Sequence, residues 1–200
     1  MKTIPLQLDM HGAEQAAQWE LSVLDAGRQV PENSAFVRWF AADALARYFA
    51  PECPESAERP ALEAHWCEAG EWGEWPGVLE LYDPRKDAHR HILVSAQETA
   101  MEPRPVWPVR IDTDELDAWD YDAVAWCYTP KRRKLENPGR DLRGIFVGWA
   151  WADEVRSWQH VSVEPHPGHP FSSMVWQATC SRLSAPSTLL ESLLGNAVSL

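Results

Sequence analysis

Hydrophobic residues follow different spacings in the first and last parts of the chain. In residues 3–10 apolar side chains alternate with polar ones, which predicts a half-buried strand. Pro5 lies within this strand and cannot donate a backbone hydrogen bond, so we expect the strand at the edge of a sheet. Residues 13–27 and 33–51 instead repeat apolar side chains every three or four positions, which predicts two helices. A third, shorter helix is expected over residues 61–72, ending near a glycine.

The second of these helices carries the longest apolar stripe. Asn33 or Ser34 can cap its N-terminus, and Pro51 ends it. The side chains expected to be buried are Val37, Phe40, Ala41, Ala44, Leu45 and Tyr48.

From residue 77 onward the spacing is typical of strands. Segments 78–82 and 89–96 flank Asp83 and Pro84, which favour a turn, so we predict a hairpin. Segments 122–128 and 144–151 are apolar on both faces, which predicts two neighbouring antiparallel strands in the centre of a sheet. Val124, Trp126, Val147 and Trp149 should then be largely buried. Further strands are expected at 106–112, 157–164 and 173–180.

The last part of the chain predicts a short helix. Thr188 and Glu191 have the spacing of a capping box. The apolar stripe of this helix would consist of Leu189, Leu190, Leu193 and Leu194.

The order of these elements predicts the fold class. Helices precede strands, which is typical of α+β proteins, so we expect N-terminal helices packed on a mainly antiparallel β-sheet, with a short C-terminal helix. A chain of 200 residues suits a single compact domain over residues 1–200. Within it we expect a helical part at about 1–75, a sheet part at about 76–182 and the C-terminal helix at about 186–195.

Composition narrows the class of protein. No window reaches the roughly 18 apolar residues of a membrane span, and the N-terminal segment lacks the apolar core of a secretory signal. We therefore expect a soluble, cytoplasmic protein that does not bind membranes. The four cysteines contain no CxxC pair, which favours reduced thiols. Most of the twelve tryptophans should lie in the core, and a few could line a groove.

Charge is distributed unevenly. The chain has a net charge of −12, yet residues 131–144, which we call the basic segment, carry +4 and six of the eighteen Lys and Arg residues. These are Lys131, Arg132, Arg133, Lys134, Arg140 and Arg143. Because the segment joins the two most apolar predicted strands, we expect it to be a long hairpin loop, exposed and mobile when unbound.

Three explanations for the basic segment stay open. It could bind nucleic acid, with Trp126, Tyr128, Phe146 and Trp149 on the flanking strands as stacking rings. It could bind an acidic protein partner or a second copy of this chain. It could also be neutralised within the molecule by residues 112–122, which we call the acidic run: Asp112, Asp114, Glu115, Asp117, Asp120 and Asp122.

Candidate catalytic chemistry is sparse. His89 and His91 would share one face of a strand and could hold a metal with His160 or Asp83 as a third ligand. Because the HxH pattern is common by chance, a polar, solvent-facing edge of the hairpin is the favoured interpretation. His166 and His169 lie in a Pro- and Gly-rich turn. The common nucleotide-binding, hydrolase and zinc motifs are absent, so the sequence predicts no cofactor and no stoichiometric metal.

The sequence therefore favours a non-enzymatic cytoplasmic binding protein or complex subunit. It would dock through the basic segment and an aromatic sheet surface, including Tyr128, to a protein partner or, as a second possibility, to nucleic acid. One alternative is a metal-assisted hydrolase or nuclease that uses His89, His91 and nearby acids. Another is an acidic inhibitor or immunity-type protein that occupies the basic site of a nucleic-acid enzyme.

Overall fold

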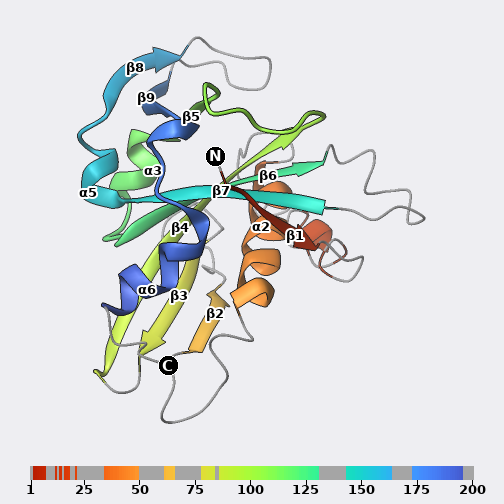
Figure 1. The fold of residues 1–200 in the computed structure, drawn as a ribbon, viewed down its shortest axis with the longest axis vertical. Coiled ribbons are helices and arrows are strands. Elements are labelled where there is room, and N and C mark those ends of the chain that lie inside the picture. The colour runs from red at the N-terminus through yellow and green to blue at the C-terminus, as the bar shows by residue number, and fades with distance from the viewer. Residues whose placement is uncertain are drawn as a thin grey trace.

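The computed structural model describes residues 2–7, 12, 14, 16–18, 21, 34–49, 61–65, 78–83, 86–130, 143–163 and 173–195. The described part of the chain is a mixed α and β fold built around two sheets (Figure 1).

The larger sheet has six strands in the order β1-β7-β6-β4-β3-β2. Its strands are β1 (Ile4–Gln7), β2 (Ala61–His65), β3 (Val78–Asp83), β4 (Ala88–Thr99), β6 (Ala123–Pro130) and β7 (Arg143–Trp151). Neighbouring strands are antiparallel except for β4 and β6, which run parallel. A parallel pair needs a long crossover connection, and β5 and α3 lie in that connection.

The smaller sheet has three antiparallel strands in the order β5-β9-β8. They are β5 (Pro108–Asp112), β8 (Gln159–Val163) and β9 (Ser173–Thr179). The helices are α2 (Ser34–Phe49), α3 (Thr113–Asp117), α5 (Ala152–Val155) and α6 (Leu189–Leu194), with 3-10 turns η1 (Cys180–Arg182) and η2 (Pro186–Thr188) before α6.

The six-stranded sheet separates two hydrophobic cores. On one face Ile92 and Val94 of β4 pack in a cluster with α2 and α6. On the other face Leu93 of β4 and Trp126 of β6 pack in a cluster with α3, α5 and the smaller sheet. Successive side chains of a strand point to opposite faces, so residues that are neighbours in sequence lie in different cores.

Several predictions from the sequence are confirmed. Strands β6 and β7 are antiparallel neighbours with a strand on either side, and Val124, Trp126, Val147 and Trp149 are all at most 2% exposed. Strand β1 lies at a sheet edge, as Pro5 predicted, and β3 and β4 form the expected hairpin. The short C-terminal helix is present, with its four leucines buried.

Other predictions are corrected. Residues 61–65 form the edge strand β2 rather than the start of a helix, because pairing with β3 from Ala61↔Tyr82 to His65↔Val78 satisfies their backbone groups. The strands form two sheets rather than one, and the predicted sheet part also contains α3 and α5. The predicted helix over 13–27 falls largely outside the described residues.

Two details of the helices also differ from expectation. Tyr48 is 38% exposed, whereas Phe36, Trp39 and Phe49 are buried, so α2 is covered on most of its circumference. Thr188 does not cap α6; its hydroxyl donates to Ala185 O and accepts a hydrogen bond from Trp149 Nε1. No helix among the described residues is long and apolar enough to span a membrane.

A β-bulge in β7 lets the C-terminal segment cross the sheet. The register of β6 and β7 shifts between Trp126 and Cys127, and Gly148 at this point has φ 153°. A Cβ on Gly148 would lie 2.6 Å from Ser184 O, so only glycine permits this approach. The neighbouring Trp149 then exchanges backbone hydrogen bonds with Ser184 at 3.3 and 2.8 Å.

Candidate functional site

The basic segment begins and ends at the centre of the six-stranded sheet. Strand β6 ends at Pro130 and β7 begins at Arg143, and the two strands are paired up to Tyr128↔Ile145. The neighbouring strands hold both ends in place, because Thr99 of β4 pairs with Pro130 and Gln7 of β1 pairs with Arg143. The segment is thus anchored at both ends by interior strands.

Of the six cations predicted to dock a partner, one lies among the described residues. Arg143 is exposed at the start of β7 and makes contacts within the molecule. Lys131, Arg132, Arg133, Lys134 and Arg140 lie outside the described residues.

The rings expected to stack on bases are buried. Tyr128 is 5% exposed and packs against Trp107 with ring centroids 5.6 Å apart. Trp126 stacks on Trp158 at 5.2 Å. Phe146 and Trp149 are at most 2% exposed and belong to the core that contains α2. All four rings therefore fill the two cores and do not face solvent. For Trp126 and Trp149 this agrees with the interior position predicted for their strands, and for Tyr128 and Phe146 it corrects the expected aromatic sheet surface.

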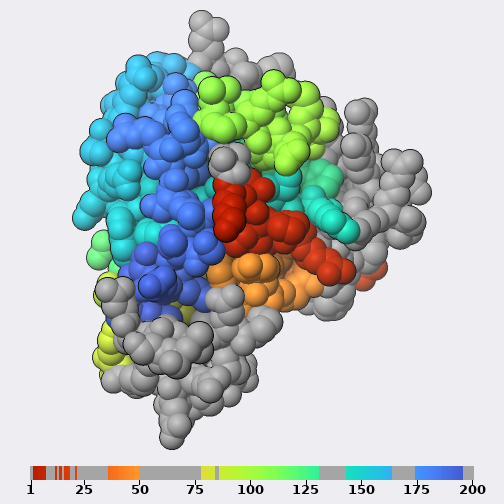
Figure 2. Space-filling view, in the orientation of Figure 1, coloured from red at the N-terminus to blue at the C-terminus, as the bar shows by residue number. Residues whose placement is uncertain are grey.

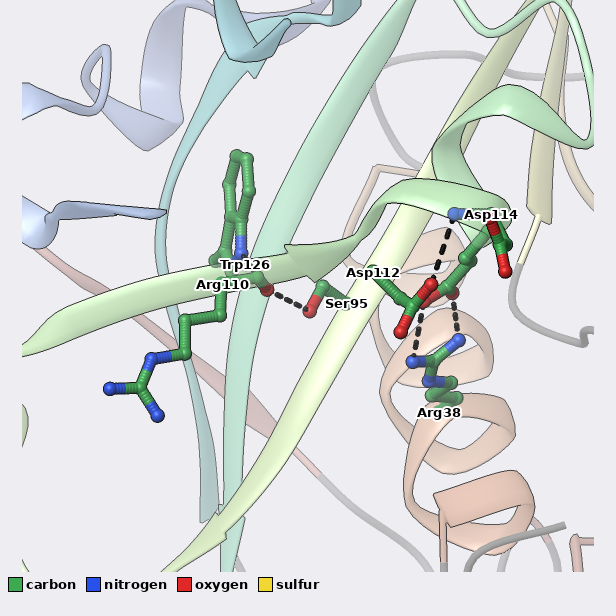
Figure 3. Close-up of polar contacts among 7 residues, drawn as sticks. Arg38, Ser95, Arg110, Asp112, Asp114 and Trp126 are labelled. Atoms are coloured by element: carbon green, nitrogen blue, oxygen red, sulfur yellow. Dashed lines mark hydrogen bonds and ion pairs between the residues drawn. The ribbon is translucent and has the colours of Figure 1, made fainter. Parts of the chain in front are cut away.

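The acidic run begins with a helix cap. Asp112 Oδ1 accepts a hydrogen bond from Asp114 N at 3.0 Å, which caps the N-terminus of α3. Within α3, Glu115 is 1% exposed and forms a bidentate ion pair with Arg38 of α2, one arm of which is 2.8 Å from Arg38 Nη2 to Glu115 Oε2. Figure 3 shows the guanidinium of Arg38 reaching from its helix toward this cap.

Burial governs the chemistry of this ion pair. Desolvation lowers the pKa of Arg38 to about 10, with Tyr121 and Asp112 acting in the opposite direction. Arg38 therefore remains a cation at neutral pH, and Glu115 supplies the counter-charge that a buried guanidinium requires. Because α2 and α3 belong to different cores, this pair also joins the two faces of the sheet.

Two further acids of the run pair with arginines outside the basic segment. Asp117 contacts Arg156 at 3.3 Å. Asp122 accepts from Arg90 Nη1 at 2.7 Å and from the backbone N of His91 at 2.8 Å. With Glu115, three of the six acids in the run are thus bound by arginines from α2, β4 and the end of α5.

The acidic run and the basic segment meet β6 at opposite ends. Asp122 directly precedes the first residue of β6, and the basic segment follows its last residue, Pro130. With a rise of about 3.3 Å per residue, the two ends of β6, where the acidic run ends and the basic segment begins, lie about 25 Å apart. At the end where the basic segment leaves, Glu98 of β4 lies opposite Thr129 and makes contacts within the molecule.

One carbonyl oxygen ties the two sheets together. Arg110 O in β5 accepts from Trp126 Nε1 at 3.3 Å and lies 3.5 Å from Ser95 Oγ of β4. The Arg110 side chain points away from both residues (Figure 3) and donates to Gln177 at 2.6 Å instead. Nothing in the sequence singled out Ser95, because a lone serine in an apolar strand carries no motif.

The histidines considered for a metal site have separate surroundings. His89 Nδ1 contacts Glu80 Oε1, and its ring packs on Tyr82 at 4.6 Å. His91 packs edge-on against Trp119. His160 stacks on Trp176 at 4.4 Å in β8, which lies at the opposite end of the molecule from the turn between β3 and β4 (Figure 1). No group of three potential metal ligands occurs among the described residues; His166 and His169 are not among these.

The described thiols are buried and protonated. Burial raises the pKa of Cys127 far above its usual value. Burial also raises the pKa of Cys180, whose thiol is hydrogen-bonded with the Tyr128 hydroxyl, and raises that of Tyr128. A nucleophilic cysteine needs a lowered pKa, so neither thiol has the properties of a catalytic nucleophile.

Comparison of the chain with protein-family models, curated proteins and solved structures found no match. The proposals below therefore rest on the residues and geometry of this molecule.

Proposed function

We propose that this protein is a non-enzymatic binding protein or complex subunit whose basic segment docks onto an acidic surface of a protein partner. The observation that carries the proposal is the separation of the segment from the acidic run along β6. A cation cluster of +4 in a chain of −12 favours a role in which it meets an acidic surface.

Pairing within the acidic run supports this view. Glu115, Asp117 and Asp122 already have arginine partners, and Asp112 is engaged as a helix cap. Neutralising the basic segment with these acids would require breaking those contacts as well as spanning about 25 Å. An external counter-charge avoids both costs.

The choice of partner class rests on the aromatic rings. Proteins that bind single-stranded nucleic acid combine cations with exposed rings on which bases stack. The four rings on the flanking strands are buried, so this combination is missing at the base of the segment. Electrostatic docking to an acidic protein needs only the cations, which favours a protein partner.

The experiment compares two triple variants that remove the same charges. Arg132/Arg133/Lys134→Ser removes two arginines and one lysine from the basic segment. Arg47/Lys86/Arg110→Ser removes the same residue types at exposed positions elsewhere, and both variants reach a net charge of −15. Each is used with the wild type to capture partners from the native host, and the captured proteins and nucleic acids are identified.

We expect the wild type and the control variant to retain the same acidic protein, and the basic-segment variant to lose it. The association rate of that purified partner should also fall as salt rises, because steering by exposed charges is screened within about 8 Å at physiological ionic strength. Equal capture by all three proteins would refute the proposal. If the wild type captures nucleic acid instead, its affinity should be measured at several salt concentrations. A slope of log affinity against log salt concentration that becomes shallower by about 2 to 3 in the basic-segment variant would identify nucleic acid as the partner.

A further inference from the structure

A cavity of about 300 Å³ lies where four segments of the chain meet. Its described lining comes from the start of the chain, from the segment before β5, from β7 and from the stretch between β9 and α6. The lining residues are Lys2, Pro105, Val147, Cys180, Ser181, Leu183, Ser184, Ala185 and Pro186. These segments adjoin one another on the face drawn in Figure 2, where the N-terminal strand is red, the segment near residue 105 is green and the C-terminal stretch is blue.

The walls of the cavity are fixed by backbone hydrogen bonds. On one side Cys180 N donates to Trp107 O and Ser181 N donates to Pro105 O, both at 2.9 Å. On the other side Ser184 N donates to Trp149 O at 2.8 Å, and Trp149 Nε1 donates to Ala185 O at 3.1 Å. A cavity held in this way needs little ordering when a ligand enters, which is typical of small-molecule sites.

The lining is apolar at the base and polar at the rim. Val147 and Cys180 are each 1% exposed, and burial keeps the Cys180 thiol protonated by raising its pKa. Lys2 and Ser181 are exposed, and Ser184 is half-buried. No hydrogen bond of the Ser184 hydroxyl with another described residue is present, so this group can donate to a ligand.

The charge around the cavity is positive although the chain is acidic. Lys2 is the charged residue among the described lining, which contains no carboxylate. Arg104 and Arg182 are exposed and adjoin the lining residues Pro105 and Ser181 in sequence, while Glu102 is the nearby acid of the same stretch. Local cations beside hydroxyl donors favour a negatively charged ligand.

We propose that this cavity binds a small organic carboxylate with a short apolar tail. The carboxylate would accept hydrogen bonds from the Lys2 ammonium and from the Ser181 and Ser184 hydroxyls. The tail would pack against Val147, Leu183 and Pro186. A volume of about 300 Å³ lies at the lower end of ligand cavities. Because a cavity of about half this volume holds benzene, a carboxylate with a tail of three or more carbon atoms fits in it.

The test uses butyrate as the probe, with the full-length protein labelled with ¹⁵N. Titration should produce saturable shifts of the backbone amides of Ser181, Leu183 and Ser184, with a Kd on the order of millimolar for a ligand of this size. Acetate should bind about tenfold more weakly, because it lacks two methylene groups that the apolar base would bury. Uncharged 1-butanol, and sodium chloride at equal ionic strength, should give no saturable shift.

Two Lys→Met variants test whether the charge of Lys2 contributes to butyrate binding. Lys2→Met should weaken butyrate binding about tenfold, the typical effect of losing a charge-assisted hydrogen bond. Lys86→Met, the same change at an exposed lysine in the β3–β4 turn, should leave butyrate binding unchanged. A second cavity variant, Ala185→Phe, should abolish the shifts by occupying the space.

Three outcomes would overturn the proposal. The first is the absence of a saturable shift with butyrate in the wild type. The second is equal butyrate affinity in the wild type and Lys2→Met. The third is tighter binding of inorganic phosphate than of butyrate, because phosphate has no tail to bury. None of these results bears on the docking proposal, because none of these variants changes a residue of the basic segment.

Discussion

The two faces of the six-stranded sheet are packed in different ways. On one face the helix α2 packs on the sheet and contributes both small side chains, such as Ala41 and Ala44, and rings, such as Phe36 and Phe40. On the other face the smaller sheet packs over β4, β6 and β7, and the space between is filled by large rings, including Trp107, Trp126 and Trp158. Packed sheets lie about 10 Å apart, and aromatic side chains fill that distance. Five of the eight tryptophans among the described residues belong to this second core or pack against it, and two belong to the core that contains α2.

The largest expected effect is a loss of stability, and it tests whether the side chains on both faces of the six-stranded sheet are tightly packed. Phe40→Ala on the helix face and Trp126→Ala on the other should each lower the free energy of unfolding by about 3 to 5 kcal/mol. Phe40 is 0% and Trp126 2% exposed. Urea unfolding would measure this, with the exposed Tyr48→Ala as control, expected to cost about 1 kcal/mol or less. A small loss for only one of the two core variants would mean that its face is not a tightly packed core.

The next effect concerns the ion pair that joins the two faces. Glu115→Gln should cost about 3 kcal/mol, because it removes the buried carboxylate that forms the bidentate ion pair with Arg38. The matched control is Asp43→Asn, which breaks the exposed pair of Asp43 with Arg47 in α2 and should cost about 0.5 kcal/mol or less. Equal costs in urea unfolding would show that the Arg38 to Glu115 contact is solvated and does not join the faces.

A smaller effect tests how the C-terminal segment crosses β7. Gly148→Ala should lower the free energy of unfolding by about 2 kcal/mol, because it adds an unfavourable positive φ and a clash with Ser184 O. In the control Gly195→Ala, φ is also positive, but the nearest atom is Lys86 Nζ at 3.8 Å, so the cost should be about 1 kcal/mol. Thermal unfolding of both variants would separate conformational strain from the clash. A Gly148 variant no less stable than the Gly195 variant would argue against close contact at the crossing.

The smallest effect is expected outside both cores. Arg132/Arg133/Lys134→Ser should change the free energy of unfolding by less than about 0.5 kcal/mol, because exposed charges contribute little to stability. The melting temperature of this variant, compared with the wild type at the same salt concentration, measures the effect. A marked decrease would indicate that the basic segment is neutralised within its own molecule, and the docking proposal should then be abandoned.

The sequence by itself determined the local features of this protein. Alternation of apolar residues located most strands, and apolarity on both faces placed β6 and β7 in the interior of a sheet. Pro5 predicted an edge, and the leucine stripe predicted α6. Each of these features depends on spacing and backbone chemistry within a few residues, which is why a linear pattern reveals them.

The tertiary structure alone decided which residues meet. Residues 61–72 have helical spacing, yet residues 61–65 form the strand β2 because they pair with β3. The strands divide into two sheets because the chain between the parallel strands β4 and β6 forms β5 of the second sheet. The pairing of Arg38 with Glu115 joins residues 77 positions apart, and the cavity at Lys2 joins residues from both ends of the chain. Contacts of this kind depend on which surfaces the folded chain brings together, and residue spacing along the sequence carries no signal of them.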